Sequence, residues 1–188
     1  MKYFNLFSKK YKKVLAFDGG GVRAIMGVYF LKKLEQESSK SIFESFDLFI
    51  GTSAGATNAL LLGMNGSTIT DLEKFWTVDN LKKIMNQSFI DKTSIFQTRP
   101  KYSNEGKKKI LQTFFEDRKI GQSLKPVVVT AYDLEARKPI LLSSYGDPEV
   151  TAVNAANASS AAPIYFPTAS MEDGRWLIDG GIVTNNPS

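Results

Sequence analysis

The chain has 188 residues, of which 43% are hydrophobic and 23% are charged, a composition that fits one globular domain and excludes a disordered chain. Its 24 Lys and Arg residues against 19 Asp and Glu give a net charge of +5, a mild surplus that favours acidic surfaces without specifying one. It contains neither Cys nor His, which excludes disulfide bonds, thiolate chemistry and a Ser-His-Asp triad, and leaves only carboxylates for a zinc site, a rare ligand set.

Residues 1–12 are predicted to form a basic N-terminal arm, ahead of a single domain that spans residues 13–188. The lysines that precede Asp18, the first acidic residue, are Lys2, Lys9, Lys10, Lys12 and Lys13. Such a cluster is typical of a solvated arm. Contact with an anionic lipid surface is the alternative, and we expect no nucleic acid as a partner.

The sequence contains no apolar run of the length that targeting or membrane insertion requires. No such run follows the N-terminal lysines, so we predict no signal peptide. The longest apolar stretch, near Leu60 to Met64, is too short to span a bilayer. We therefore expect a cytoplasmic or peripheral membrane protein, although secretion by a route that needs no signal peptide would leave no mark in this sequence.

The predicted elements alternate between short apolar runs, typical of buried strands, and longer stretches with apolar residues at helical spacing. In chain order they are strand 14–17, helix 25–37, strand 46–50, helices 54–64, 70–85 and 104–115, strands 126–132 and 139–142, helix 149–160 and strand 175–178. Thr70 or Asp71 is expected to cap the helix over 70–85. The alternation predicts an α/β fold of three layers, with a mostly parallel central sheet flanked by helices.

Gly51-Thr52-Ser53-Ala54-Gly55 has the Gly-x-Ser-x-Gly pattern of a nucleophile elbow. It lies between the strand at 46–50 and the helix at 54–64, which is the context that this motif requires. The turn is so tight that side chains beside the serine would clash, and it lifts the hydroxyl clear of the backbone. Ser53 is therefore the candidate nucleophile; a glycine-lined turn with a buried or capping serine is the alternative.

The glycine run Asp18-Gly19-Gly20-Gly21-Val22-Arg23 follows the first predicted strand and opens a helix. Consecutive glycines let several backbone N–H groups converge, and the helix N-terminus adds positive potential, which predicts a site for a phosphate or a tetrahedral oxyanion. A flexible connecting turn is the alternative. Gly19-x-Gly21-x-x-Ala24 also fits a dinucleotide fingerprint, but Asp47 is predicted inside the second strand rather than at its end, so that fit is poor.

Without histidine, an activated Ser53 would need Asp, Glu, Lys or Tyr as its base. Asp179 is the candidate, because it ends the last predicted strand and precedes Gly180-Gly181, so we expect it beside the elbow at the carboxyl edge of the sheet. Asp173 also precedes a glycine, but a hairpin turn explains it. A turn or helix-capping role is the alternative for Asp179 itself.

Together these motifs resemble those of the patatin-like phospholipases, lipid acyl hydrolases with a Ser-Asp dyad. The family's DGGGxRG loop is similar to Asp18 to Ala24, its GxSxG motif to Gly51 to Gly55, and its DGG motif to Asp179 to Gly181, in that order. Further stretches that resemble the family are Ala158 to Pro163, Tyr165 to Pro167 and Asn185 to Pro187. Ala24 stands where the family usually has Gly, which crowds the start of the helix slightly and leaves the glycine donors in place.

The resemblance implies hydrolysis of fatty acyl esters in phospholipids or neutral lipids, with no metal or other cofactor. Ser53 would attack the ester carbonyl, and Asp179 would take the proton of Ser53 and return it to the leaving alcohol. The oxyanion and substrate-binding residues would be Gly19, Gly20, Gly21, Arg23 and Ala54. Of these, the backbone N–H groups of Gly20, Gly21 and Ala54 would hold the oxyanion, and Arg23 would orient the loop or a lipid phosphate.

Two other functions stay open at this point. A catalytically silent lipid-binding or interaction module would keep the cleft without turnover, and a carboxylesterase or thioesterase for small soluble esters would differ in chain-length preference. Family domains usually continue beyond the Asp-Gly-Gly motif, so the resemblance also leads us to expect a chain truncated at its C-terminus. The irregular apolar stretch from Phe89 to Phe96 is expected to be ordinary core, with a lid or bilayer contact as the alternative. The sequence specifies no activating partner.

Overall fold

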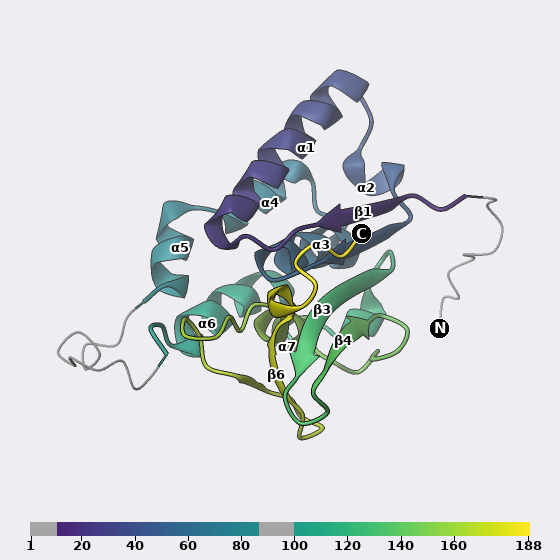
Figure 1. Ribbon diagram of the computed structural model, residues 1–188. Coiled ribbons are helices and arrows are strands. Elements are labelled where there is room, and N and C mark those ends of the chain that lie inside the picture. Colours follow the sequence, from purple (N-terminus) through teal and green to yellow (C-terminus); the bar gives the residue numbers. More distant parts are fainter. Residues whose placement is uncertain (1–10, 87–99) are drawn as a thin grey trace.

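Figure 1 shows the computed structural model, which describes residues 11–86 and 100–188. Most of the predicted basic arm, residues 1–10, lies outside the described residues. The same holds for residues 87–99, which include the apolar stretch from Phe89 to Phe96. The predictions made for these two segments therefore remain predictions.

The described residues form one six-stranded mixed sheet. Its strands are β1 (Val14–Phe17), β2 (Leu48–Gly51), β3 (Val127–Asp133), β4 (Lys138–Ser143), β5 (Ala169–Ser170) and β6 (Trp176–Asp179). The pairs β1–β2 and β2–β3 are parallel, while β4 and β6 run antiparallel to β3, and β5 antiparallel to β6. Four of these six strands thus run in one direction, which confirms the predicted α/β class with a mostly parallel sheet.

Two strands, β2 and β6, pair with different halves of the same edge of the long strand β3. β4 pairs along residues 128–133 of β3, so β2 and β6 must both lie on the opposite edge. There Gly51 of β2 is opposite Val129, and Asp179 of β6 is opposite Ala131. Because β6 is antiparallel to β3, its carboxyl end meets the carboxyl end of β2 head-on. The expected proximity of Asp179 to the elbow is therefore found, but it arises from an antiparallel strand instead of the shared edge of parallel ones.

Two inner helices, α3 (Ala54–Asn65) and α7 (Ala152–Ser159), pack on one face of the sheet and against each other; in the view of Figure 1 they lie behind the strands. Every residue of α3 from Gly55 to Met64 is buried, as its nearly continuous apolar sequence predicts. Further helices stack on this inner pair: α1 (Ala24–Ser38) and α4 (Ile69–Phe75) against α3, and α6 (Asn104–Phe115) against α7.

The single helix predicted over 70–85 is wrong, because the structure has two helices there. These are α4 and α5 (Val78–Ile84), separated by Trp76 and Thr77. The hydroxyl of Thr77 accepts from the N–H of Asn80 and begins the second helix, while the Asn80 amide donates to the last carbonyl groups of the first. The first helix also begins earlier than predicted, with Thr68 as its cap.

The remaining elements are short and mostly connect the larger ones. They are the helix α2 (Ile42–Ser45) and the 3-10 turns η1 (Gly21–Arg23), η3 (Ile120–Gln122) and η4 (Gly180–Ile182). The turn η1 forms the second half of the glycine run from Asp18 to Arg23, and η4 follows directly on Asp179. Within residues 11–86 and 100–188, no helix combines the length and the apolar character needed to cross a membrane.

A matched pair of glycine substitutions tests the packing of α3 against the end of β1. A Cβ added at Gly55 would lie 2.5 Å from the carbonyl oxygens of Phe17 and Asp18, whereas one added at Gly27 in α1 meets no atom within 4 Å. We expect Gly55→Ala to lower the free energy of unfolding by about 1–3 kcal/mol, and Gly27→Ala to raise it by about 0.5–1 kcal/mol. Urea denaturation measures both; similar effects of the two variants would contradict this packing.

Candidate active site

Ser53 lies in the turn between β2 and α3, where it is the N-cap residue of the helix with φ of 55°. Such a positive φ is strained for a residue with a side chain. The two motif glycines make the turn feasible, because a Cβ at Gly51 would lie 2.4 Å from the carbonyl oxygen of Gly55, and one at Gly55 would strike the end of β1. The strand-turn-helix geometry of a nucleophile elbow is therefore present around Ser53.

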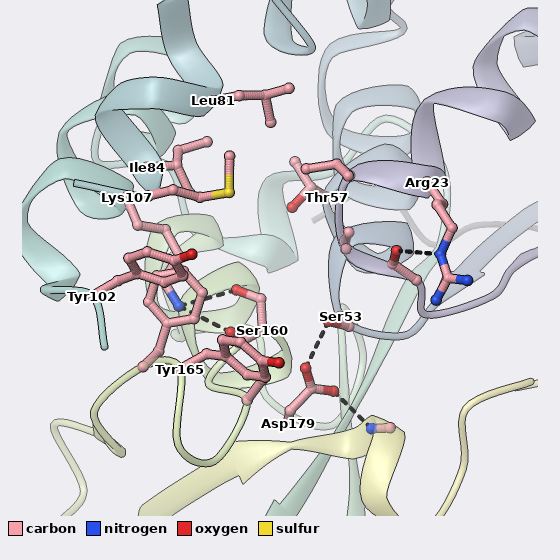
Figure 2. A pocket seen from close by; sticks show the side chains of 18 of the residues that line it. Arg23, Ser53, Thr57, Leu81, Ile84, Tyr102, Lys107, Ser160, Tyr165 and Asp179 are labelled. Carbon is pink, nitrogen blue, oxygen red and sulfur yellow. Dashed lines mark hydrogen bonds between the residues drawn. The ribbon is translucent and has the colours of Figure 1, made fainter. Parts of the chain in front are cut away.

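Asp179 is in direct contact with Ser53, although 126 residues separate them in sequence. The Ser53 hydroxyl donates a hydrogen bond of 2.6 Å from its Oγ to the Asp179 Oδ2. The other carboxylate oxygen, Oδ1, accepts from the backbone N–H of Gly181 at 2.7 Å. Figure 2 shows both bonds, which fix the plane of the carboxylate and direct one oxygen at the serine.

The environment of Asp179 makes it a stronger base than an exposed carboxylate. The residue is only 5% exposed, and this burial raises its pKa above the usual value of 3.8. The hydrogen bonds from Ser53 and Gly181 and the charge of Lys107 lower the pKa, but by less than burial raises it. A raised pKa improves proton transfer from a hydroxyl near neutral pH.

Further polar contacts hold the elbow in place. The backbone N–H of Ser53 donates to the Ser159 Oγ at the end of α7, over 2.9 Å. Thr130, which lies in β3 between the partners of Gly51 and Asp179, donates from its hydroxyl to the Thr52 Oγ1, over 2.8 Å. The Thr52 hydroxyl in turn donates to the carbonyl oxygen of Thr184. Both Thr52 and Ser159 are fully buried, so these bonds are shielded from water.

The Gly-rich loop presents free backbone donors to the site. Within the described residues, the N–H groups of Gly20, Gly21 and Ala54 have no hydrogen-bond acceptor, and all three residues line the cavity that contains Ser53. The N–H of Gly19, in contrast, donates to the carbonyl oxygen of Asn185 at 3.0 Å. Arg23 is exposed and donates from its Nε to the carbonyl oxygen of Gly20, over 3.5 Å. Gly19 and Arg23 therefore shape the loop, and the other residues supply the unpaired donors.

Ser53 and Asp179 open into a cavity of about 550 Å³, which is within the range of small-molecule sites. Much of its wall is apolar and comes from α4, α5 and α6. The side chains there include Phe75, Trp76, Leu81, Ile84 and Leu111. In Figure 2, Leu81 and Ile84 lie well away from the Ser53–Asp179 pair. The arrangement is polar at one end and apolar at the other. Within the described residues, no group of three acidic side chains is placed to hold a metal ion.

Lys107 is a residue of this cavity that sequence reasoning missed. It is 4% exposed, and its Nζ donates to the carbonyl oxygen of Ser160 at 3.1 Å and to the Ser160 Oγ at 3.3 Å. Burial lowers the pKa of Lys107 to about 7, against the opposing effect of the Asp179 charge. The sequence did contain an indication of its burial. Lys107 is three and four residues before Ile110 and Leu111, a spacing that places it on the apolar face of the predicted helix. Ser159 lies in the family-like stretch Ala158 to Pro163, but nothing in that stretch indicated its contact with Ser53.

Comparisons with known proteins find a matching family model and several similar sequences. The family model described as "Patatin-like phospholipase" matches residues 15–188. Patatin-like protein 4 of Arabidopsis thaliana is 30% identical over 211 residues, which cover 100% of this chain and 51% of that protein. A cGAMP-activated phospholipase of Pseudomonas aeruginosa is 31% identical over 180 residues, covering 93% of this chain and 54% of that protein. The chain thus spans about half the length of these curated relatives.

A solved structure shares the fold at low sequence identity. The crystal structure of VipD from Legionella pneumophila superposes with a TM-score of 0.68 at 16% identity, over 94% of this chain and 47% of that one. At this identity the likeness concerns the fold alone. It supports the arrangement of sheet and helices described above.

Substitution of Ser159 tests how far α7 supports the elbow. We expect Ser159→Ala to lower the free energy of unfolding by about 1–3 kcal/mol, because the partly buried N–H of Ser53 would lose its acceptor. Ser170→Ala, at an exposed position of β5, is the control and should change it by no more than about 0.5 kcal/mol. Urea denaturation compares the two variants. Equal, small effects would show that the Ser53 backbone does not depend on Ser159.

Proposed function

This chain belongs to the patatin-like phospholipase family, and we propose that it hydrolyses fatty acyl esters of phospholipids or other acyl lipids with Ser53 and Asp179 as a catalytic dyad. The observation that carries the proposal is the 2.6 Å hydrogen bond from the Ser53 Oγ to the Asp179 Oδ2. The chain contains no histidine, so imidazole cannot activate the serine. A buried carboxylate that already accepts the hydroxyl proton provides the base instead.

In the first half of the proposed reaction, the Ser53 Oγ attacks the ester carbonyl carbon while its proton moves to the Asp179 Oδ2. The carbonyl oxygen becomes an oxyanion, which the unpaired N–H groups of Gly20, Gly21 and Ala54 stabilise. The tetrahedral intermediate then breaks its bond to the alcohol oxygen, and that oxygen takes the proton from Asp179. The products are the free alcohol, a lysolipid when the substrate is a phospholipid, and an acyl ester on Ser53.

In the second half, water replaces the alcohol. Asp179 accepts a proton from the water as its oxygen attacks the acyl carbon, and the same N–H groups stabilise the second oxyanion. The bond between the acyl carbon and the Ser53 Oγ then breaks, and the proton returns from Asp179 to Ser53. The fatty acid leaves, and the hydrogen bond between Ser53 and Asp179 is restored.

The roles proposed for the other loop residues follow from their contacts. The N–H of Gly19 is already bonded to Asn185, so we assign Gly19 to the shape of the loop and not to oxyanion binding. A Cβ at Gly19 would collide with the Asn185 Oδ1, so a side chain there would displace the Asn185 amide from its place beside the loop. Arg23 holds the loop through the carbonyl oxygen of Gly20.

The shape and chemistry of the cavity support a lipid as the substrate. Its apolar wall provides a surface for an acyl chain, and burial of each methylene group contributes about 0.8 kcal/mol. Val22, Tyr165 and Ile182 line the cavity and are also about half exposed. Apolar side chains at the mouth suit contact with a lipid surface better than with water, so we propose that the protein contacts membranes peripherally when it takes up its substrate.

Two substitutions test the dyad. We expect Ser53→Ala to abolish both labelling by a fluorophosphonate probe and release of fatty acid from phosphatidylcholine vesicles. We expect Asp179→Asn to lower the rate by roughly 10²–10⁴-fold, as loss of a general base does. Asp133→Asn is the matched control, because Asp133 is an equally buried aspartate in β3 whose carboxylate binds the N–H groups of Glu135 and Ala136. Activity retained by either dyad variant would disprove the mechanism, whereas activity on short soluble esters alone would identify a small-ester esterase.

The pH dependence of kcat/KM provides a second test. Asp179 must be ionised to accept a proton, so activity is expected to fall as pH decreases through its pKa, which burial holds above 3.8. A single acid limb above that value is the expected profile. The chain has no imidazole that could produce such a limb. A rate that stays constant down to the range of ordinary exposed carboxyl groups would show that Asp179 is not the base.

A further inference from the structure

Lys107 is the only Lys or Arg among the described residues that is buried. It lies in α6, and its side chain lines the same cavity as Ser53 and Asp179. Figure 2 shows its ammonium group bonded to Ser160, on the side of the cavity from which Tyr102 and Tyr165 also project. The reaction steps proposed above do not use this residue. A buried charge is costly unless it has partners, so its presence at this place calls for an explanation.

The contacts of Lys107 fix its ammonium group within the site. The Nζ donates to the carbonyl oxygens of Asn157 and Ser160 and to the Ser160 Oγ, and it lies 4.0 Å from the centre of the Phe166 ring. The two carbonyl groups belong to the end of α7, where the helix dipole is negative and favours a cation. Face-on contact with an aromatic ring adds further attraction. The position of the charge is thus set by four partners on α7 and the loop that follows it.

The charges of Lys107 and Asp179 affect each other. The charge of Asp179 raises the pKa of Lys107 against the effect of burial, and the charge of Lys107 lowers the pKa of Asp179 against the effect of burial. Because both side chains are shielded from water, salt screens their interaction less than it would on the surface. The carboxylate and the ammonium group therefore stabilise each other's ionised form.

Other charged groups around the site are less well placed to replace Lys107. Neither α7 nor the segment from Ser160 to Pro167 contains Asp, Glu, Lys or Arg. The titratable side chain that this segment contributes to the cavity is that of Tyr165. Arg23, across the cavity, is exposed. The charged residues of α5 and of α6 itself also have half-exposed or exposed side chains; they are Asp79, Lys82, Lys83, Glu105, Lys108 and Lys109.

We propose that Lys107 is a positioning residue that provides the counter-charge for Asp179, so that the buried carboxylate is ionised and ready to accept the proton of Ser53. This inference rests on the proposed function of the dyad. Lys107 touches no reacting atom in this proposal and acts through Asp179. The competing explanation is a purely structural one, in which Lys107 only ties α6 to the end of α7.

Titration of the Asp179 carboxyl group by carbon-13 NMR, without substrate, distinguishes the two explanations. In Lys107→Met, we expect Asp179 to titrate at higher pH, by about one pH unit, as loss of a nearby opposite charge predicts. In Lys107→Arg, which keeps the charge, it should titrate close to its position in the unchanged chain. Lys109→Met, an exposed position in the same helix, is the matched control and should have no effect. An unchanged titration in folded Lys107→Met would overturn the proposal.

A reciprocal measurement keeps the proposal testable if Lys107→Met does not fold. In Asp179→Asn, the titration of the Lys107 side chain, followed by NMR of labelled lysine, should move to lower pH, because the charge that raises its pKa is gone. No movement would overturn the counter-charge role. Neither titration requires turnover. Shifts in both, in a chain that hydrolyses no acyl ester, would leave the Lys107–Asp179 pair established and reject the function proposed for the dyad.

Kinetics then connect the pair to catalysis. If Lys107 keeps Asp179 ionised, the acid limb of kcat/KM in Lys107→Met moves to higher pH by as much as the titration of Asp179 does. In Lys107→Arg the limb returns to its position in the unchanged chain. A structural tether would instead lower the rate equally at all pH values. That uniform loss, with an unmoved limb, would contradict the proposal.

Discussion

The division of one edge of β3 between β2 and β6 is the constraint on which the site depends. β2 ends opposite Val129, and β6 occupies the remaining half of that edge in the antiparallel direction. Their carboxyl ends therefore meet, with Thr130 between them. A shift of β6 by one residue would turn Asp179 to the other face of the sheet, away from Ser53. The packing of Gly180 against Thr130, where no Cβ has room, restricts such a shift.

The end of α7 is the second element that the site requires. Ser159 holds the backbone of Ser53, and the next residue, Ser160, binds the ammonium group of Lys107. One helix terminus thus connects Ser53 with the buried ammonium group of Lys107. Burial of Lys107 and Asp179 separately would cost free energy, and it is offset by their mutual attraction and by hydrogen bonds to each. In the role proposed for Lys107, each charge therefore stabilises the other.

Much of the fold, and the proximity of Asp179 to Ser53, could be predicted because the relevant constraints are local. The turn at Ser53 requires glycine on both sides, and the burial of α3 requires an apolar sequence, so both leave a pattern. The helix over 70–85 was mispredicted because the caps at Thr77 and Asn80 override its apolar periodicity. The roles of Lys107 and Ser159 were missed because their partners are remote: Lys107 binds Ser160, 53 residues away, and Ser159 binds Ser53, 106 residues away.

The sequence by itself determined the strand-turn-helix units, the elbow around Ser53, the candidate base Asp179 and the absence of imidazole. Only the tertiary structure decided how these meet: that Asp179 arrives on an antiparallel strand, that Gly19 has its N–H occupied while Gly20 and Gly21 do not, and that Lys107 shares the cavity. The physical reason is the distance along the chain over which each kind of interaction acts. Turn sterics and periodicity act over a few neighbouring residues, whereas strand pairing and buried charge pairs join residues whose separation in the chain carries no information about their contact.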